Sequence, residues 1–132
     1  MAKVAMKAKQ PKRVVLNTNF AGISAGSILY VATPDIIAAY VAKIPPGETR
    51  SVEQLRRDLA RRNRADATCP VSTAIFLRSI AEVALRALAE GEARDAVVPF
   101  WRVITADTKI AKRLPVDTDW LDAQLAVERA QA

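Results

Sequence analysis

The sequence predicts a single, mainly α-helical domain with a minor β component, organised around a helix-turn-helix. Three observations support this fold class. Hydrophobic residues make up 51% of the 132 residues, which is enough for a folded core. Apolar residues recur at helical spacing in four segments, whereas only residues 27–32 show a strand pattern. Two of the helical segments, 52–63 and 70–88, are separated by a short turn, as in a helix-turn-helix.

Basic residues are concentrated at the N-terminus and in the second helical segment. The chain has 20 Lys and Arg residues against 14 Asp and Glu residues, with a net charge of +6 and a pI near 9.9. Residues 1–13 contain five of the basic residues and no acid. We expect them to form a disordered basic arm, which either follows a phosphate backbone or only keeps the protein soluble. The domain then spans residues 14–132, and the charge balance is typical of a nucleic-acid binder.

Residues 14–32 predict a loop followed by the short strand at 27–32. Thr33 then provides an N-cap and Pro34 the first position of a helix. Apolar residues continue at helical spacing to Ile44, and the sequence Pro45-Pro46-Gly47 ends this first helix.

The second helix, predicted over residues 52–63, begins after Ser51, which is a favourable N-cap. Arg57, Arg61 and Arg64 recur at i, i+4 and i+7 and therefore share its outer face. A solvated charged face is the usual meaning of such a run. Six arginines between positions 50 and 64, flanked by two acids, favour a surface that faces phosphates.

Residues 63–69 predict a turn, and Pro70 opens a third helix that continues to Leu88. Ser72 and Thr73 lie in its first turn, where small polar residues and free backbone N–H groups suit docking against a DNA backbone. Phe76 is either an apolar wedge between base steps or a residue that packs against a neighbouring loop. We expect the packing role.

The run Val98-Pro99-Phe100-Trp101-Arg102-Val103-Ile104 gathers rings and β-branched residues around one arginine. The proline favours an irregular or edge segment over a central strand. Phe100 and Trp101 either close the core or, with Arg102, line a pocket. Residues 105–115 predict a loop. Thr118 is expected to cap a last helix, whose core-facing residues are Trp120, Leu121 and Leu125.

The chain offers little for catalysis. It has one cysteine, Cys69, and no histidine, so an internal disulfide and the commonest general base and metal ligand are excluded. Without a base to form its thiolate, Cys69 is expected to be inert. We find no nucleophile–base pair, no metal cluster and no glycine-rich phosphate loop, and we expect neither an enzyme nor a cofactor. No apolar run approaches the ~20 residues that span a bilayer, and no signal peptide is evident, which predicts a cytoplasmic protein, associated with the nucleoid if it binds DNA.

The run at 98–104 resembles the active-site motif of the O6-alkylguanine-DNA alkyltransferase family, which reads isoleucine-proline-cysteine-histidine-arginine-valine. Pro99, Arg102 and Val103 match it. The resemblance covers residues 33–128 in order: a first helix that ends in isoleucine-proline, a helix-turn-helix, the proline-arginine motif and a closing helix. Glu128 matches a glutamate of the family's last helix.

This resemblance places Phe100 at the alkyl-accepting cysteine and Trp101 at the histidine that activates it. Val52 replaces a tyrosine that presses on the phosphate of the flipped nucleotide. Ser72 or Thr73 falls at the position of the arginine that fills the gap left by the extruded base. The implied fold is the winged helix-turn-helix-like C-terminal domain of the alkyltransferases, without their ribonuclease-like N-terminal domain.

The short, alkyltransferase-like members of the family bind alkylated guanine in DNA without repairing it and pass the lesion to excision repair. The resemblance therefore implies a non-enzymatic DNA-binding protein with duplex DNA, and possible repair proteins, as partners. The residues expected to contact DNA are Arg50, Ser51, Arg57, Arg61, Arg64, Ser72, Thr73 and Phe76, and those expected to line a reduced pocket are Phe100, Trp101 and Arg102. The alternative is a protein-interaction or regulatory module that kept the winged-helix fold without lesion recognition.

Overall fold

The computed structural model describes residues 10–131. This part of the chain is mainly helical with a small three-stranded sheet, which confirms the expected class of α with minor β. The strands are β1 (Lys12–Val15), β2 (Ile28–Val31) and β3 (Ala67–Thr68), and the α-helices are α1 (Pro34–Ala42), α2 (Val52–Arg62), α3 (Pro70–Ala89) and α4 (Thr118–Gln131). Short 3-10 turns are η2 (Arg94–Ala96), η3 (Phe100–Arg102) and η4 (Ile110–Arg113).

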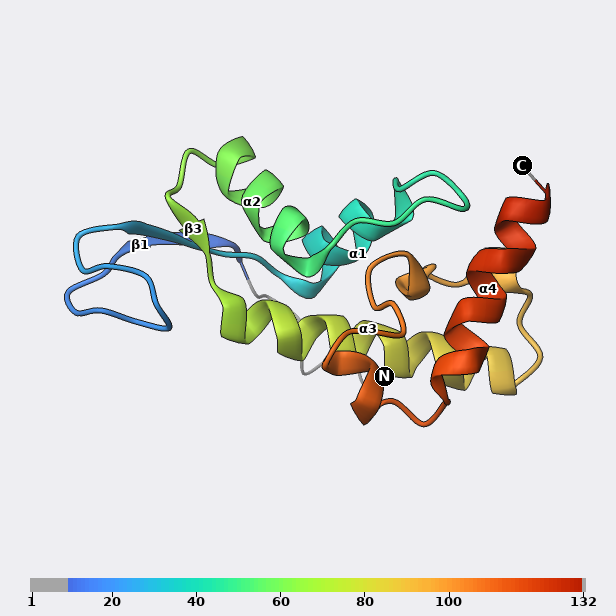
Figure 1. The fold of residues 1–132 in the computed structure, drawn as a ribbon. Helices are drawn as coiled ribbons and strands as arrows, with labels where there is room; N and C mark the ends of the chain where they lie inside the picture. Colours follow the sequence, from blue (N-terminus) through green and yellow to red (C-terminus); the bar gives the residue numbers. More distant parts are fainter. Residues whose placement is uncertain (1–9, 132) are drawn as a thin grey trace.

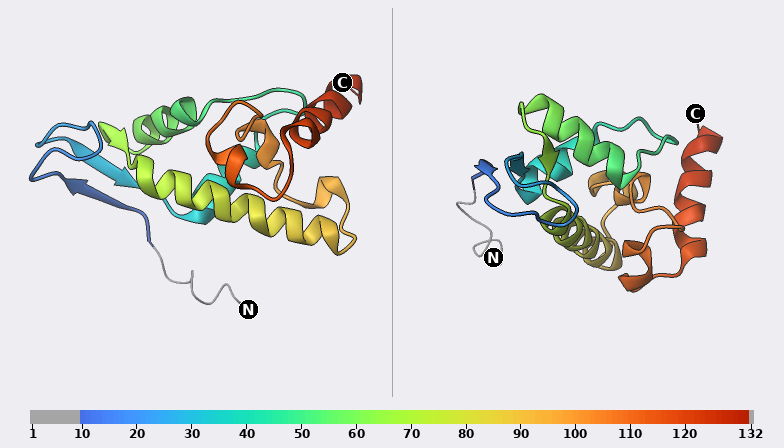
Figure 2. Two further views of the ribbon diagram at one scale, coloured as in Figure 1. Left: turned by 60° about the horizontal axis from the view of Figure 1, so that its bottom comes forward. Right: turned by 60° about the vertical axis from the view of Figure 1, so that its left-hand side comes forward.

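The elements are arranged around α3, the longest helix (Figure 1). The sheet, α2 and the beginning of α3 gather at one end of the molecule, and α4 crosses the other end, as the two views of Figure 2 also show. The predicted order of helix, turn and helix is present at 52–89, with β3 formed inside the turn. The segment at 98–104 is irregular, as expected, and η4 adds one turn of helix to the predicted loop at 105–115.

The N-terminal region differs from the prediction. Lys12 and Arg13, expected to belong to a disordered arm, form β1, which pairs antiparallel with β2 so that Lys12 lies opposite Val31. The predicted strand at 27–32 is therefore one arm of a hairpin, and β2 also pairs in parallel with β3. The two β-branched residues Val14 and Val15 favour the extended strand. Residues 1–9 of the predicted arm lie outside the described residues.

Side-chain caps set the beginnings of three helices. Thr33 Oγ1 accepts a hydrogen bond from the Ile36 N–H, and Ser51 Oγ accepts one from the Gln54 N–H at 2.9 Å, both as predicted. At α4 the cap is Asp117, whose Oδ1 accepts from the Trp120 N–H at 3.0 Å. Thr118, expected to be that cap, is the first helical residue instead, since a carboxylate one position earlier reaches the free N–H groups.

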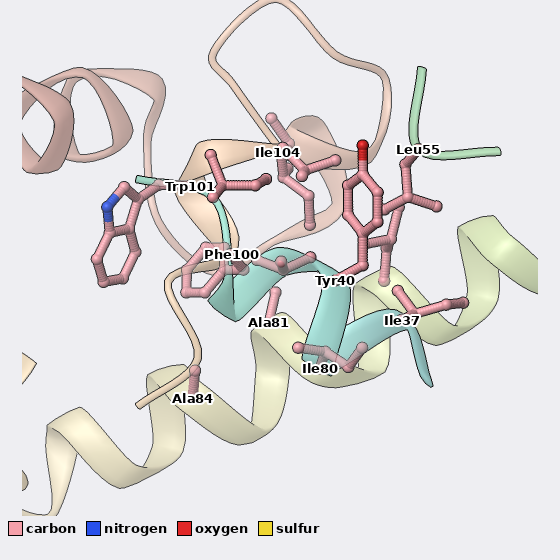
Figure 3. Close-up of a cluster of buried hydrophobic side chains, with 14 of the residues drawn as sticks. Ile37, Tyr40, Leu55, Ile80, Ala81, Ala84, Phe100, Trp101 and Ile104 are labelled. Atoms are coloured by element: carbon pink, nitrogen blue, oxygen red, sulfur yellow. The ribbon is translucent and has the colours of Figure 1, made fainter. Parts of the chain in front are cut away.

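The hydrophobic core lies where α1, α2, α3, η3 and α4 meet. Phe100 and Trp101 lie in the segment above α3, with Ala81 and Ala84 on the helix below them (Figure 3). Both rings are fully buried, and they pack edge to face with centroids 5.3 Å apart. The Trp120 ring stacks on Phe100 at 6.0 Å. Phe100 is therefore a core residue, whereas Trp101 is buried and also borders a hollow.

Candidate nucleic-acid interface

Two of the three predicted arginines, Arg57 and Arg61, lie one turn apart on α2, and the third, Arg64, lies two residues beyond its end. Arg57, Arg61 and Arg64 are all exposed. The side chain of Arg61 is 72% exposed and approaches Asp58 at 3.5 Å, a geometry that contributes little to stability. Arg57 and Arg64 form no ion pair with any residue between 10 and 131. These guanidinium groups are therefore accessible to an external anion.

Arg64 occupies a backbone position that ordinarily favours glycine. Its φ is +54°, in the left-handed region. The Ala65 N–H donates to the Ala60 carbonyl at 2.9 Å and the Arg64 N–H to the Arg61 carbonyl at 3.3 Å, which is the hydrogen-bond pattern of a Schellman C-cap with Arg64 at its left-handed residue. A side chain in this conformation costs roughly 1–2 kcal/mol. The position thus exposes an arginine at the expense of local stability.

A groove of about 500 Å³ lies between α2, β3 and the loop of the β1–β2 hairpin. Arg56, Arg57 and Arg61 contribute its cations, and Ile23 forms the wall on the hairpin side. Arg13 ties the hairpin to the end of α2 through a hydrogen bond from its Nη2 to the Arg64 carbonyl at 3.3 Å. The arginine face therefore continues into a concave surface.

The beginning of α3 is less polar than the sequence suggested. Ser72 is half-buried, but Thr73 is only 1% exposed, and its hydroxyl donates to the Cys69 carbonyl at 2.6 Å. Thr73 is therefore not a surface contact, because its side chain is used inside the helix. Phe76 packs against the core, in agreement with the expected packing role and not with an apolar wedge between base steps. Cys69 is buried at the helix start, while Val71 and Ile75 are 50% and 56% exposed.

Arg50 and Ser51 are engaged by their own chain. Nη1 of Arg50 donates to Glu48 Oε1 at 3.1 Å and to the Thr49 carbonyl at 3.0 Å. The Arg50 N–H donates to the Arg102 carbonyl at 2.9 Å, and the exposed Ser51 hydroxyl caps α2. Arg50, 29% exposed and paired, is therefore less accessible to phosphate than Arg57 and Arg64, whereas the Ser51 O–H can still donate outward.

The predicted pocket residues are divided between the core and a buried ion pair. Phe100 is enclosed by the core and does not line the hollow beside Trp101 and Arg102. The Arg102 guanidinium forms a forked pair with Glu128, with Nη2 2.7 Å from Oε2 and Nε 3.1 Å from Oε1. Its Nη1 also donates to the Ile44 carbonyl at 2.6 Å. Arg102 therefore holds α4 against the end of the first helix.

Glu128 is the centre of this arrangement, which we name the α4 junction (Gly47, Trp101, Arg102 and Glu128). The Trp101 Nε1–H donates to Oε2 at 3.0 Å and the Gly47 N–H to Oε1 at 2.8 Å. Burial alone would raise the pKa of Glu128, but the hydrogen bonds from Arg102, Gly47 and Trp101 outweigh it and hold the pKa below its usual value. The hollow of about 660 Å³ beside Trp101 and Arg102 is thus bordered by groups that are already paired.

A smaller hollow of about 270 Å³ lies on the other flank of α2. The Tyr40 hydroxyl donates to Asp58 Oδ2 at 2.6 Å, and the Arg62 guanidinium lies 5.2 Å from the Tyr40 ring centroid. Burial, followed by the bond to Asp58, raises the pKa of Tyr40 to about 12. Tyr40 is therefore a fixed donor at neutral pH, and it is not poised to act as a base.

Lys109 and Arg113 of the η4 region escaped the sequence reasoning; they border a hollow of about 300 Å³ next to Ile75 and Arg78 of α3. Arg56, counted in the arginine cluster but not among the expected DNA contacts, lines the groove, and Lys12 and Arg13, expected in the basic arm, are part of the hairpin. The run Lys109-Ile110-Ala111-Lys112-Arg113 was a visible signal in the sequence, whereas nothing local indicated that the hairpin lies beside α2.

The helices of residues 10–131 do not include one with both the length and the apolar character needed to cross a bilayer. In comparisons with known proteins, no family model matches the chain, and no significant match is found among curated proteins or solved structures.

Proposed function

We propose that this chain is a non-enzymatic DNA-binding protein that holds duplex DNA through its phosphates. The observation that carries the proposal is the exposed row Arg57, Arg61 and Arg64, in which two of three guanidinium groups have no ion-pair partner within residues 10–131. Lys and Arg side chains that neutralise phosphates dominate the affinity of such proteins. Arg64 adds weight, because backbone strain kept at an exposed cation is typical of functional positions.

We further propose that 52–89 acts as a winged helix-turn-helix of the kind found in alkyltransferase-like proteins. In this arrangement α3 would place its N-terminal N–H groups near a phosphate, and the β1–β2 hairpin would act as the wing. The hairpin, α2 and the beginning of α3 all lie at one end of the molecule, which supports a single contact surface (Figure 1).

Covalent alkyl transfer forms no part of this proposal. The acceptor position holds Phe100, which is enclosed by the core, and Cys69 is buried at the start of α3. A base flipped toward position 100 would have to displace a packed ring. We therefore propose that binding does not depend on O6-alkylguanine.

Titration of the protein with plain and O6-methylguanine duplexes at several salt concentrations tests the function. We expect equal affinities for the two duplexes and a log–log salt slope of about −0.9 per neutralised phosphate. Incubation with duplex labelled on the methyl group should leave the protein unlabelled. Absence of duplex binding at low salt would contradict the proposal. A clear preference for the methylated duplex would show that the protein recognises the lesion.

A second candidate is a protein-interaction or regulatory module. It is favoured by the exposed apolar residues of α3, namely Val71, Ile75 and Val83, the last of which is 60% exposed. Scattered apolar side chains are common on protein surfaces, and here Arg78, Glu82 and Arg86 interrupt them. The arginine face of α2 therefore carries the stronger argument.

A further inference from the structure

The groove between α2, β3 and the hairpin has two chemically different parts. Its floor is made of small residues, Ala60, Ala65 and Ala67, and its hairpin wall is Ile23. Arg56, Arg57 and Arg61 lie along α2 at its edge. Of the two acids in the lining, Asp66 is occupied, since its Oδ2 accepts a hydrogen bond from the Ile28 N–H at 2.8 Å. Small apolar side chains beside several guanidinium groups suit a ligand with one apolar planar part and one anionic group.

The Arg56 side chain indicates where the anionic group of the ligand would bind. Its Nε–H is sealed from solvent and has no hydrogen-bond partner, the single such side-chain atom within residues 10–131. A buried donor without a partner is unfavourable, so a conformation that gives it a partner is favoured. If the guanidinium turns into the groove toward an anion, the donor gains a partner and the penalty is removed.

The dimensions of the groove favour one nucleotide. A volume of about 500 Å³ lies within the range of small-ligand sites and is too small to admit a double helix. Guanidinium planes and apolar side chains stack on the faces of unpaired bases, and arginine forks bind phosphate. A bare inorganic anion would leave the alanine floor and Ile23 unused.

We propose that this groove binds a single unpaired nucleotide, with its base on the alanine floor and its phosphate at Arg56, Arg57 and Arg61. The inference deepens the proposed DNA binding and rests on it: the duplex lies on the exposed face of α2, and a single-stranded end or flap enters the groove. The protein is thereby expected to prefer junctions between double-stranded and single-stranded DNA over blunt duplex.

Fluorescence anisotropy with a blunt duplex and with the same duplex carrying a short single-stranded overhang tests the proposal. We expect the overhang to raise affinity by about tenfold, as one stacked base does. Ala67→Leu fills the groove without changing charge and should abolish this preference while leaving affinity for the blunt duplex unchanged. The matched control is Ala123→Leu, at an exposed position on α4 away from the sheet, which should retain the preference.

Arg56→Lys provides an independent variant, because it keeps the charge and removes the planar fork. It should reduce the preference for the overhang at unchanged salt slope, and its thermal stability should not fall, since the unpartnered Nε–H is gone. The inference would be overturned if the wild type bound both DNAs equally, or if Arg56→Lys and Ala67→Leu kept the wild-type preference for the overhang. Either result would leave the duplex proposal standing. Absence of binding to either DNA would overturn both.

Discussion

Arg102 and the arginines of α2 show how the same side chain serves two purposes in one small domain. At the α4 junction the Arg102 side chain is 12% exposed, and its three nitrogens donate to Glu128 and to the Ile44 carbonyl. On α2, Arg61 is 72% exposed and its one partner, Asp58, lies 3.5 Å away; Arg57 on the same helix and Arg64 just after it have no ion pair within residues 10–131. Burial and pairing, and not residue type, therefore decide which arginine stabilises the fold and which is accessible to a ligand.

The two regions also differ in how well their buried groups are stabilised. The α4 junction has no buried side-chain nitrogen or oxygen without a hydrogen-bond partner, whereas the α2 region contains a strained Arg64 and an unpartnered Arg56 Nε–H. Each of these features lowers stability by an amount of order 1 kcal/mol or more. A region that is less stable than its composition allows is a reasonable place for binding, since a ligand can supply the missing interactions.

Replacement of Glu128 by alanine should have the largest effect on stability. It would leave Arg102 buried without its counter-charge and remove the acceptor of the Trp101 and Gly47 N–H groups, so we expect a loss of about 4–5 kcal/mol in urea unfolding. Glu82→Ala is the matched control, because Glu82 forms a single ion pair with Arg78 at 39% exposure. That variant should lose about 0–1 kcal/mol. Similar losses in the two variants would contradict the proposed difference between the buried and the exposed ion pair.

The stability of the protein should depend on pH through Glu128. Because folding holds the pKa of Glu128 below its ordinary value of 4.5, its contribution is complete above pH 4.5 and is lost as the pH falls through the lower folded-state pKa. Unfolding titrations between neutral and acid pH should show this component in the wild type. Glu128→Ala should lack it, and an unchanged acid profile would show that Glu128 is not the group responsible.

Phe100→Ala separates a core residue from a residue that reads bases. The ring packs against Trp101 and Trp120, so we expect a loss of about 3–4 kcal/mol in stability. Under conditions where the variant is folded, its affinity for plain duplex DNA should equal that of the wild type. A stable variant with weakened DNA binding would place position 100 in the interface.

Arg64→Gly should produce opposite effects on stability and binding. Glycine adopts the left-handed conformation without a steric penalty, so the variant should be about 1 kcal/mol more stable, after allowance for the entropy of the unfolded chain. The loss of one phosphate contact should reduce the salt slope by about one unit. Arg64→Lys is the control, which keeps the charge and the strain. A less stable Arg64→Gly protein would exclude the proposed strain.

Much of the fold followed from local sequence signals. Thr33-Pro34, Ser51 and Pro70 marked the beginnings of α1, α2 and α3, because caps and N-terminal prolines act within one turn. β1 was missed since its pairing with β2 is not local: Lys12 and Arg13 resemble a basic tail until Ile28–Val31 is placed beside them. The cap of α4 was displaced by one residue, an ordinary uncertainty at helix ends.

The candidate site could be predicted in part. Helical spacing correctly gave the shared, exposed face of Arg57 and Arg61, as it depends on one helix alone, whereas Arg64 is exposed but lies beyond the end of α2 in a left-handed conformation that helical spacing does not describe. The role of Arg102 could not be deduced, because its partner Glu128 is 26 residues away and reaches it only after α4 has packed. Thr73 was assigned to the surface although it is buried in the folded protein and its hydroxyl bonds the Cys69 carbonyl one turn earlier, a local contact that the sequence does not distinguish from exposure.

The double variant Arg57→Ala/Arg61→Ala tests the central claim most directly. Both side chains are exposed and weakly paired, so the stability should change by less than about 0.5 kcal/mol. The log–log salt slope for duplex DNA should fall by roughly one to two units relative to the wild type. An unchanged slope in a folded double variant, or a marked loss of stability, would contradict the claim that these arginines are held for phosphates.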